Sequence, residues 1–408
     1  APPSGPTPPP PGLAHRPPRR PHSPDMETAR RTHGFTESVI REMTRVARRH
    51  GAVNLAQGFP NYPAPGVVKE AGAGAIRDDV NQYAVTWGAR RLREAVADHY
   101  RRRHGMEVDP EREVTVTCGA TEAMAASLMA LVDPGDRVIV PEPFYENYGP
   151  DAVLCGADPV FVPLGEGPGL DPDAMADAFD DATRAVVLNT PNNPTGRVFP
   201  RDELEAVAGL CRRHDAVAVT DEIYEHLVYE GEHVPIASLP GMRERSVTVS
   251  GASKTFAVTG WRIGWIVAPP GATDAIRKVH DFLTVGAPAP LQEGVAAGME
   301  RLGDGYFEVL LEDYRERRRI LVEGLRDAGF RCRPPEGAYY VLADFSGLDD
   351  RPDDAFARWL AAEVGVAPVP GSSFFSDPAD GRDLVRFAFC KTTDVLEEAV
   401  SRLTAALG

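Results

Sequence analysis

Apolar residues recur with two different periods along the chain, and they predict strands alternating with helices between about residues 114 and 267. The predicted strands are short runs of β-type residues at 114–118, 137–140, 159–163, 185–189, 217–220, 246–250 and 263–267. Helical periodicity separates several of these runs, for example over 123–132 and 202–214. This alternation indicates a mixed, mostly parallel sheet covered by helices.

The pattern changes on both sides of this block. Residues 1–25 are rich in Pro with Arg, Ser and His, a composition that cannot bury a core, and they predict a disordered tail. Residues 35–48 have apolar positions at helical spacing, with Thr36 as the expected N-cap. Beyond Pro290 we expect a smaller α+β domain, with its elements at 306–328, 330–333, 338–344, 355–364, 367–369, 385–389 and from Asp394 onward.

Composition narrows the class of protein. A chain of 408 residues is long enough for two or more domains, and its net charge of −16 disfavours general binding to nucleic acids or anionic membranes. The five cysteines are widely spaced and form no C-x-x-C pair, so we expect neither a disulfide framework nor a metal site. No apolar run reaches transmembrane length and the N-terminus lacks a signal-peptide core, so we expect a cytoplasmic protein.

Candidate chemistry is concentrated around Lys254, which lies among small residues directly after a predicted strand. Small neighbours let a flat ligand approach the backbone, and a lysine amine there can form a Schiff base with a carbonyl. Arg262 follows eight positions later and can hold a phosphate through its planar fork. An aldehyde and a phosphate on one ring describe pyridoxal 5′-phosphate. The alternative is an ordinary strand with a solvated lysine and a structural arginine.

Three further motifs follow predicted strands. The GATEA sequence starting at Gly119 opens a helix, whose free N–H groups and dipole can cradle a phosphate. Asn193 lies in the turn-rich sequence NTPNNPTG and can donate to a phenolate oxygen. Asp221 ends a strand, where open α/β sheets bind ligands, and a carboxylate there can keep a pyridine nitrogen protonated. Each motif has a plain alternative: a small-residue turn, a loop and a helix N-cap.

The ordered set of motifs GATEA, PFYENY, NTPNNPTG, DEIY, SGASKTFAVTGWRIGW and RFAF resembles the class I/II aminotransferases, which are pyridoxal-phosphate enzymes of fold type I. It most resembles the branch that includes kynurenine and methionine aminotransferases, from about Phe35 to the end. The resemblance implies an α/β fold in four parts: a tail over 1–25, a segment over 26–55 packing with the small domain, a large cofactor-binding domain over 56–290 and a small domain over 291–408. It also implies a homodimer with active sites at its interface.

The resemblance implies a role for each matching residue around the cofactor. Lys254 forms the Schiff base and moves the proton between Cα and C4′, while Asp221 pairs with the pyridine nitrogen. Tyr145 stacks on the ring, and Asn193 and Tyr224 hydrogen-bond its phenolic oxygen. The remaining cofactor contacts are expected from Gly119, Ala120, Thr121, Ser250, Ser253, Arg262 and, across the dimer interface, Tyr83. Many relatives have a hydroxyl where this chain has Gly251, so we expect either that Ser250 or Ser253 replaces that phosphate contact or that the contact is missing.

For the substrate, the resemblance implies that Arg386 clamps the α-carboxylate, with Gly58 and Asn193 beside it. Phe59, Tyr62 and Trp87 are candidates for an apolar or aromatic side-chain pocket. No cation beyond Arg262 and Arg386 falls within the pocket motifs, so we expect aromatic, sulfur-containing or glutamine-like amino donors and a 2-oxo acid acceptor. Alternatives on the same fold are a C–S β-lyase, an oxidase, a decarboxylase or an aminotransferase-like regulatory protein, because fold does not fix reaction.

Overall fold

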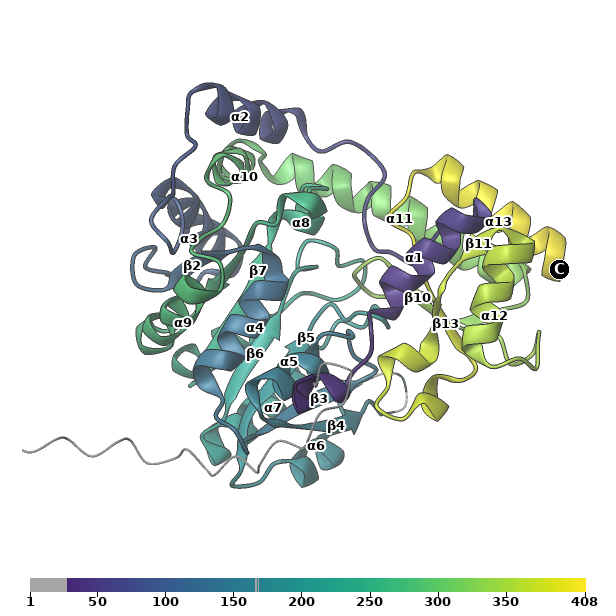
Figure 1. Ribbon diagram of the computed structural model, residues 1–408, viewed down its shortest axis with the longest axis horizontal. Helices are drawn as coiled ribbons and strands as arrows, with labels where there is room; N and C mark the ends of the chain where they lie inside the picture. The colour runs from purple at the N-terminus through teal and green to yellow at the C-terminus, as the bar shows by residue number, and fades with distance from the viewer. Residues whose placement is uncertain (1–27, 166, 168) are drawn as a thin grey trace, which may run out of the picture.

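The computed structural model describes residues 28–165, 167 and 169–408. The disordered tail expected over 1–25 lies outside these residues. Figure 1 shows a large sheet with helices on both sides and, next to it, a smaller group of strands and helices formed by the C-terminal part of the chain. Among the described residues, no helix is long and apolar enough to cross a membrane.

The large sheet contains seven strands within the described residues, in the order β2-β8-β7-β6-β5-β3-β4. Their bounds are β2 Val114–Thr117, β3 Arg137–Glu142, β4 Asp158–Pro163, β5 Thr183–Asn189, β6 Val217–Asp221, β7 Ser246–Gly251 and β8 Gly264–Val267. Strands β4, β3, β5, β6 and β7 pair in parallel, whereas β8 runs antiparallel to both β7 and β2. The predicted mixed, mostly parallel sheet is therefore confirmed.

Helices cover this sheet on both faces because its strands are apolar on both faces. Val138 and Val140 of β3 pack in a core with α4, α5 and α9, whereas Ile139 between them packs on the opposite side with α6 and α7. A third core joins β2 and β8 to α2, α3 and α10. The helix bounds are α2 Gly66–Arg77, α3 Arg90–His104, α4 Gly119–Leu131, α5 Tyr148–Cys155, α6 Pro172–Ala178, α7 Arg201–His214, α8 Ala252–Thr255, α9 Pro270–Leu283 and α10 Ala289–Arg301.

The C-terminal part forms a second sheet, in the order β12-β13-β10-β9. Its strands are β9 Arg331–Cys332, β10 Tyr340–Asp344, β12 Val369–Pro370 and β13 Leu384–Ala388, and its helices are α11 Asp304–Asp327, α12 Asp353–Trp359 and α13 Thr393–Leu407. The N-terminal helix α1, Val39–His50, packs in the same core, and β1, Val53–Asn54, pairs in parallel with β11, Val366–Ala367. The exact domain boundaries stay predictions.

One local expectation was wrong and a second needs refinement. Thr36 does not cap the first helix, because α1 begins at Val39 and the Ser38 hydroxyl accepts the hydrogen bond from the Arg41 N–H. The helix expected over 355–364 is not uniform: α12 ends at Trp359 and continues as a π-helical turn, Leu360–Val364. The capping residue depends on where the chain leaves the preceding loop, which local sequence does not specify.

Candidate active site

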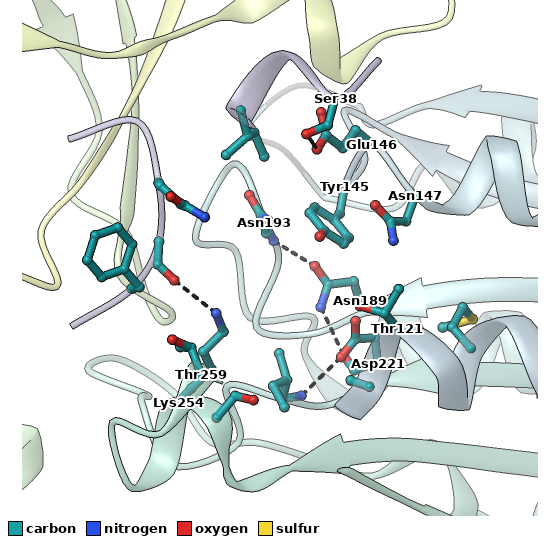
Figure 2. Close-up of a pocket in the computed structure, with 18 of the residues that line it drawn as sticks. Ser38, Thr121, Tyr145, Glu146, Asn147, Asn189, Asn193, Asp221, Lys254 and Thr259 are labelled. Atoms are coloured by element: carbon teal, nitrogen blue, oxygen red, sulfur yellow. Dashed lines mark hydrogen bonds between the residues drawn. The ribbon is translucent and has the colours of Figure 1, made fainter. Parts of the chain in front are cut away.

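A cavity of about 490 Å³ lies at the carboxyl ends of β5, β6 and β7, where the second sheet closes over them. Its volume falls within the range of pockets for small molecules. Figure 2 shows Lys254, Asp221, Asn193 and Tyr145 turned toward this space from different elements. The predicted site residues that line it are Gly58, Phe59, Ala120, Thr121, Tyr145, Asn193, Asp221, Tyr224, Ser253, Lys254, Arg262 and Arg386.

Lys254 lies in the short helix α8, one turn after β7 delivers the chain to the cavity. Its Nζ donates a hydrogen bond of 2.9 Å to the carbonyl oxygen of Gly58 (Figure 2). Burial lowers the pKa of this amine to about 8. About a tenth of the amine is therefore neutral at pH 7 and about half at pH 8, far more than for an ordinary lysine, and the neutral form is what a nucleophile or a proton acceptor requires.

Asp221 is the last residue of β6, and only 8% of it is exposed. Its Oδ2 accepts a hydrogen bond of 2.9 Å from the Tyr148 hydroxyl, and its Oδ1 accepts one from the Ile223 N–H. Burial raises the pKa of Asp221 to about 6, against the opposing effect of the Tyr148 hydrogen bond. The carboxylate is ionised at neutral pH and oriented by its donors, so it is suited to hold a cationic nitrogen.

The start of α4 forms an anion cradle together with Arg262. Gly119 has a φ of +80°, and a Cβ there would lie 2.4 Å from the Arg262 guanidinium. That guanidinium donates to the Thr259 carbonyl at 3.1 Å and to the Cys118 carbonyl at 3.4 Å. The backbone of Gly264 in β8 packs directly against the start of α4, because a Cβ on Gly264 would lie 2.5 Å from the Gly119 carbonyl carbon. Free N–H groups and a cation thus face the same space.

The absent hydroxyl at Gly251 has a packing reason. A Cβ at Gly251 would lie 3.0 Å from both the Gly264 Cα and the Ile263 carbonyl oxygen, so a side chain there would press against β8. Of the two proposed replacements, Ser253 lines the cavity. Ser250 does not, because its hydroxyl points away and donates to Glu225 Oε1 at 3.1 Å.

Arg386 is completely buried and its two terminal nitrogens are held by uncharged oxygens. Nη1 donates to Asn193 Oδ1 at 2.7 Å and Nη2 donates to the Ala56 carbonyl at 2.6 Å. The Tyr340 ring stacks on the guanidinium at 4.2 Å. Within the described part of the chain, Arg386 Nε has no hydrogen-bond partner. A buried cation with a free donor beside a cavity is a receptor for an anion.

Several other predicted site residues are not among the residues that line this cavity. Tyr62 hydrogen-bonds Tyr314 at 2.7 Å and stacks against Arg317, and Trp87 stacks against Arg277 at 4.8 Å. Tyr83 is 85% exposed. Gly119 contributes through the turn beside the cavity rather than through its lining. The roles of these residues in binding stay predictions.

Sequence reasoning missed four residues that shape the cavity. Tyr148 lies within the motif PFYENY, three positions after Tyr145, and orients Asp221. Asn189 accepts from the Asn193 N–H and donates to the Asp221 carbonyl (Figure 2). Tyr340 hydrogen-bonds Tyr224 at 3.0 Å. Arg41 of α1 also lines the cavity, and it was missed because it lies outside the motifs that were searched for cations.

Comparison with known proteins gives consistent matches. A family model for aminotransferase class I and II matches residues 50–403. The chain is 41% identical to a probable N-succinyldiaminopimelate aminotransferase of Mycobacterium tuberculosis, over 92% of this chain and 98% of that protein. It is 37% identical to human kynurenine–oxoglutarate transaminase 1, over 92% and 97%. A solved Escherichia coli structure with a methionine aminotransferase function superposes with a TM-score of 0.89 at 34% identity, covering 93% of this chain and 100% of that one.

Proposed function

Because the chain belongs to the class I and II aminotransferases, which depend on pyridoxal 5′-phosphate, we propose that its cavity moves the amino group of an aromatic, sulfur-containing or glutamine-like L-amino acid to a 2-oxo acid. The observation that carries the proposal is the pairing of Lys254 with a buried, anion-accepting Arg386 in one cavity. The first residue handles the amino group and the second binds the carboxylate on the same carbon.

The lining residues fit the cofactor at three of its groups. The start of α4 and Arg262 present N–H donors and a cation to its phosphate, with Ser253 nearby. Asp221 offers a buried carboxylate to the pyridine nitrogen. Asn193 has its side-chain oxygen occupied by Arg386, so its amide NH₂ remains free to donate to the phenolic oxygen. Bound pyridoxal 5′-phosphate supplies an aldehyde that takes up the amino group and a ring that withdraws electrons from Cα.

The side chains of this protein perform the remaining tasks. Lys254 Nζ would hold the cofactor through its aldehyde and, once the substrate amino group has displaced it, would accept the proton from the substrate Cα, because its lowered pKa favours the neutral amine. Asp221 keeps the pyridine nitrogen positively charged, and Tyr148 holds Asp221 in place through its hydroxyl. Arg386 fixes the α-carboxylate, which directs the Cα hydrogen toward Lys254.

The side-chain end of the cavity supports the choice of donor. Phe59 and Ile40 line it, and the Lys391 ammonium lies 3.8 Å from the centre of the Phe59 ring while donating to the Phe59 carbonyl at 2.7 Å. Phe59 is thereby anchored as an apolar wall. Such a wall favours aromatic and thioether side chains over charged ones.

A second candidate donor carries an additional carboxylate, as in N-succinyldiaminopimelate. Arg41, on the rim of the cavity, is a cation within reach of the space around Ile40 and Glu146. The 41% identical relative is named for that substrate. Arg41 is exposed to solvent, which screens its charge. Its attraction for a distal carboxylate is therefore weaker than that of a buried arginine.

The experiment is a panel of amino donors followed by single-turnover spectroscopy on wild type and Arg41→Ala. Kynurenine, phenylalanine, methionine and glutamine should react with the wild type, and Arg41→Ala should leave their kcat/KM within about twofold. If only N-succinyldiaminopimelate reacts, and Arg41→Ala abolishes that reaction, the second candidate replaces the first. Release of ammonia and pyruvate from cysteine conjugates, without transfer of the amino group to the cofactor, would establish the lyase instead.

We also propose that the active unit is a homodimer. Large apolar side chains are exposed on two segments that touch each other, since His280 at the end of α9 hydrogen-bonds the Thr86 carbonyl at 2.8 Å. Phe282 is 92% exposed and Tyr83 is 85% exposed, and the same segments expose Ile76, Val80, Val85, Leu283 and Val285. A patch of this kind is typical of a protein interface.

Subunit mixing tests both the dimer and the role of Tyr83. Inactive Tyr83→Ala and Lys254→Ala subunits should together regain activity, because one hybrid site then has both residues intact. If Tyr83 serves its own subunit, no hybrid site is complete and the mixture stays inactive. Sedimentation of the unmixed protein as a monomer at assay concentration would refute the dimer itself.

A further inference from the structure

Two histidines and one glutamate, His99, His104 and Glu225, form a cluster behind the active site, where the loop that follows β6 meets α3. His99 and His104 on α3 each direct Nε2 at Glu225 Oε2, at 3.1 Å and 2.9 Å. These three ligand atoms all lie within 4.8 Å of one another. Glu225 is 1% exposed and His99 is 8% exposed, so the cluster is shielded from bulk water. Nothing in the proposed transamination uses this cluster.

We propose that His99, His104 and Glu225 bind one divalent transition-metal ion, with zinc as the best match in ligand type. Two imidazoles and one carboxylate are a known protein ligand set for zinc and for its neighbours in the first transition row. Ligand atoms bonded to one tetrahedral ion at about 2.1 Å lie about 3.4 Å apart. The two histidine–glutamate separations, 3.1 and 2.9 Å, therefore need to open by only a few tenths of an ångström, and the two imidazole nitrogens, which lie within 4.8 Å of each other, need to reach a similar distance.

A neighbouring cavity supplies a second, independent observation. This cavity, of about 470 Å³, is lined by His99 and His226 together with Thr255, Trp265 and Phe307. Only 8% of His226 is exposed, and its Nδ1 has no hydrogen-bond partner within the described part of the chain. The His226 ring centre lies 5.2 Å from that of His99, so a small shift of the His226 ring would let its enclosed, unpaired Nδ1 hydrogen-bond a metal-bound water in this cavity.

The surroundings orient the proposed ligands. Ser250 donates to the second oxygen of Glu225 at 3.1 Å, which leaves Oε2 to face the two histidines. Arg103 donates to the Glu225 backbone carbonyl at 3.2 Å and so fixes the loop rather than occupying the carboxylate. An ion here would tie α3 to the segment that includes Asp221, at the end of β6, and Tyr224. The site thus stabilises the frame of the active site without taking part in the reaction.

The expectation of no metal site rested on the spacing of the cysteines, whereas the ligands proposed here are histidines and a glutamate dispersed along the chain. Glu225 is 126 positions from His99, and the two histidines are five positions apart on one helix rather than in a zinc-binding motif.

The test uses the full-length holoenzyme, treated with a chelator and then titrated with Zn²⁺ by equilibrium dialysis and with Co²⁺ by visible absorption. We expect about one equivalent per chain, a visible d–d band with Co²⁺ and a rise in Tm of about 2–4 °C at saturation. His104→Gln and Glu225→Gln should each weaken binding by at least about 10- to 100-fold. His50→Gln, which changes an exposed histidine on α1, is the matched control and should bind as the wild type does.

Four outcomes would overturn the site. These are no saturable equivalent of Zn²⁺, unchanged affinity in His104→Gln, an equal rise in Tm with Mg²⁺, or thiolate charge-transfer bands that place Co²⁺ on a cysteine. Circular dichroism and the cofactor absorption of each variant show whether it has folded. If Glu225→Gln does not fold, His104→Gln decides alone, because His104 is the last residue of α3 and glutamine there keeps a hydrogen-bond donor for Glu225.

Discussion

Replacing Arg386 with lysine tests whether Arg386 binds the α-carboxylate of the substrate. A guanidinium has five N–H donors, and Arg386 commits one to Asn193 Oδ1 and one to the Ala56 carbonyl. Three remain, including the unpartnered Nε, which is enough for two bonds to a carboxylate. A lysine ammonium has three donors, so it retains one for the substrate if it keeps both internal contacts.

The variant therefore loses one charge-assisted hydrogen bond, which contributes about 1.5–3 kcal/mol. This loss corresponds to a decrease in kcat/KM of about 10- to 150-fold. The decrease should be similar for every amino acid and every 2-oxo acid, because all share the α-carboxylate. The assay is steady-state kinetics over the donor panel, with cofactor content and circular dichroism measured on the same samples.

Arg262→Lys is the matched control for this experiment. Arg262 lies at the anion cradle of α4, so its replacement should weaken retention of the cofactor, while substrate KM at saturating cofactor stays near the wild-type value. Arg386→Lys could instead lower kcat/KM only for substrates with one class of side chain. Arg386 would then bind the substrate side chain, and the proposed substrate orientation would be wrong.

Three further predictions concern the cavity. The rate at which apoenzyme binds the cofactor covalently at Lys254 should rise about tenfold per pH unit from pH 6.5 and level off near pH 8, because burial lowers the pKa of Lys254 to about 8. A rate that continues to rise up to pH 10, measured by stopped-flow absorbance, would contradict this prediction. Asp221→Ala should slow Cα-proton removal by about 10²- to 10³-fold in single-turnover spectra, and a near-normal rate would rule out its role. Gly58→Ala should lower the free energy of unfolding in urea by about 1–3 kcal/mol, because its Cβ would lie 2.1 Å from the Tyr340 hydroxyl oxygen, whereas the control Gly271→Ala meets no atom within 4 Å and should change little.

Much of the architecture could be predicted from local sequence. Each predicted strand of the large sheet appears within two residues of its expected ends, because buried parallel strands are continuous apolar runs bounded by turn residues. The link between motif and position was also local: Gly119 opens α4, Asp221 ends β6 and Lys254 follows β7. Parallel pairing then brings the carboxyl ends of β5, β6 and β7 to one edge of the sheet.

Contacts between distant segments were decided only by the tertiary structure. The sequence determined which residue types follow which strands, since helix and strand periodicity and turn chemistry act over a few positions. It did not determine that Tyr148 would orient Asp221 or that Arg41 would reach the cavity rim. Nor did it determine that His99 would meet Glu225. Such meetings depend on how packed layers align, a property of the whole core rather than of any one segment.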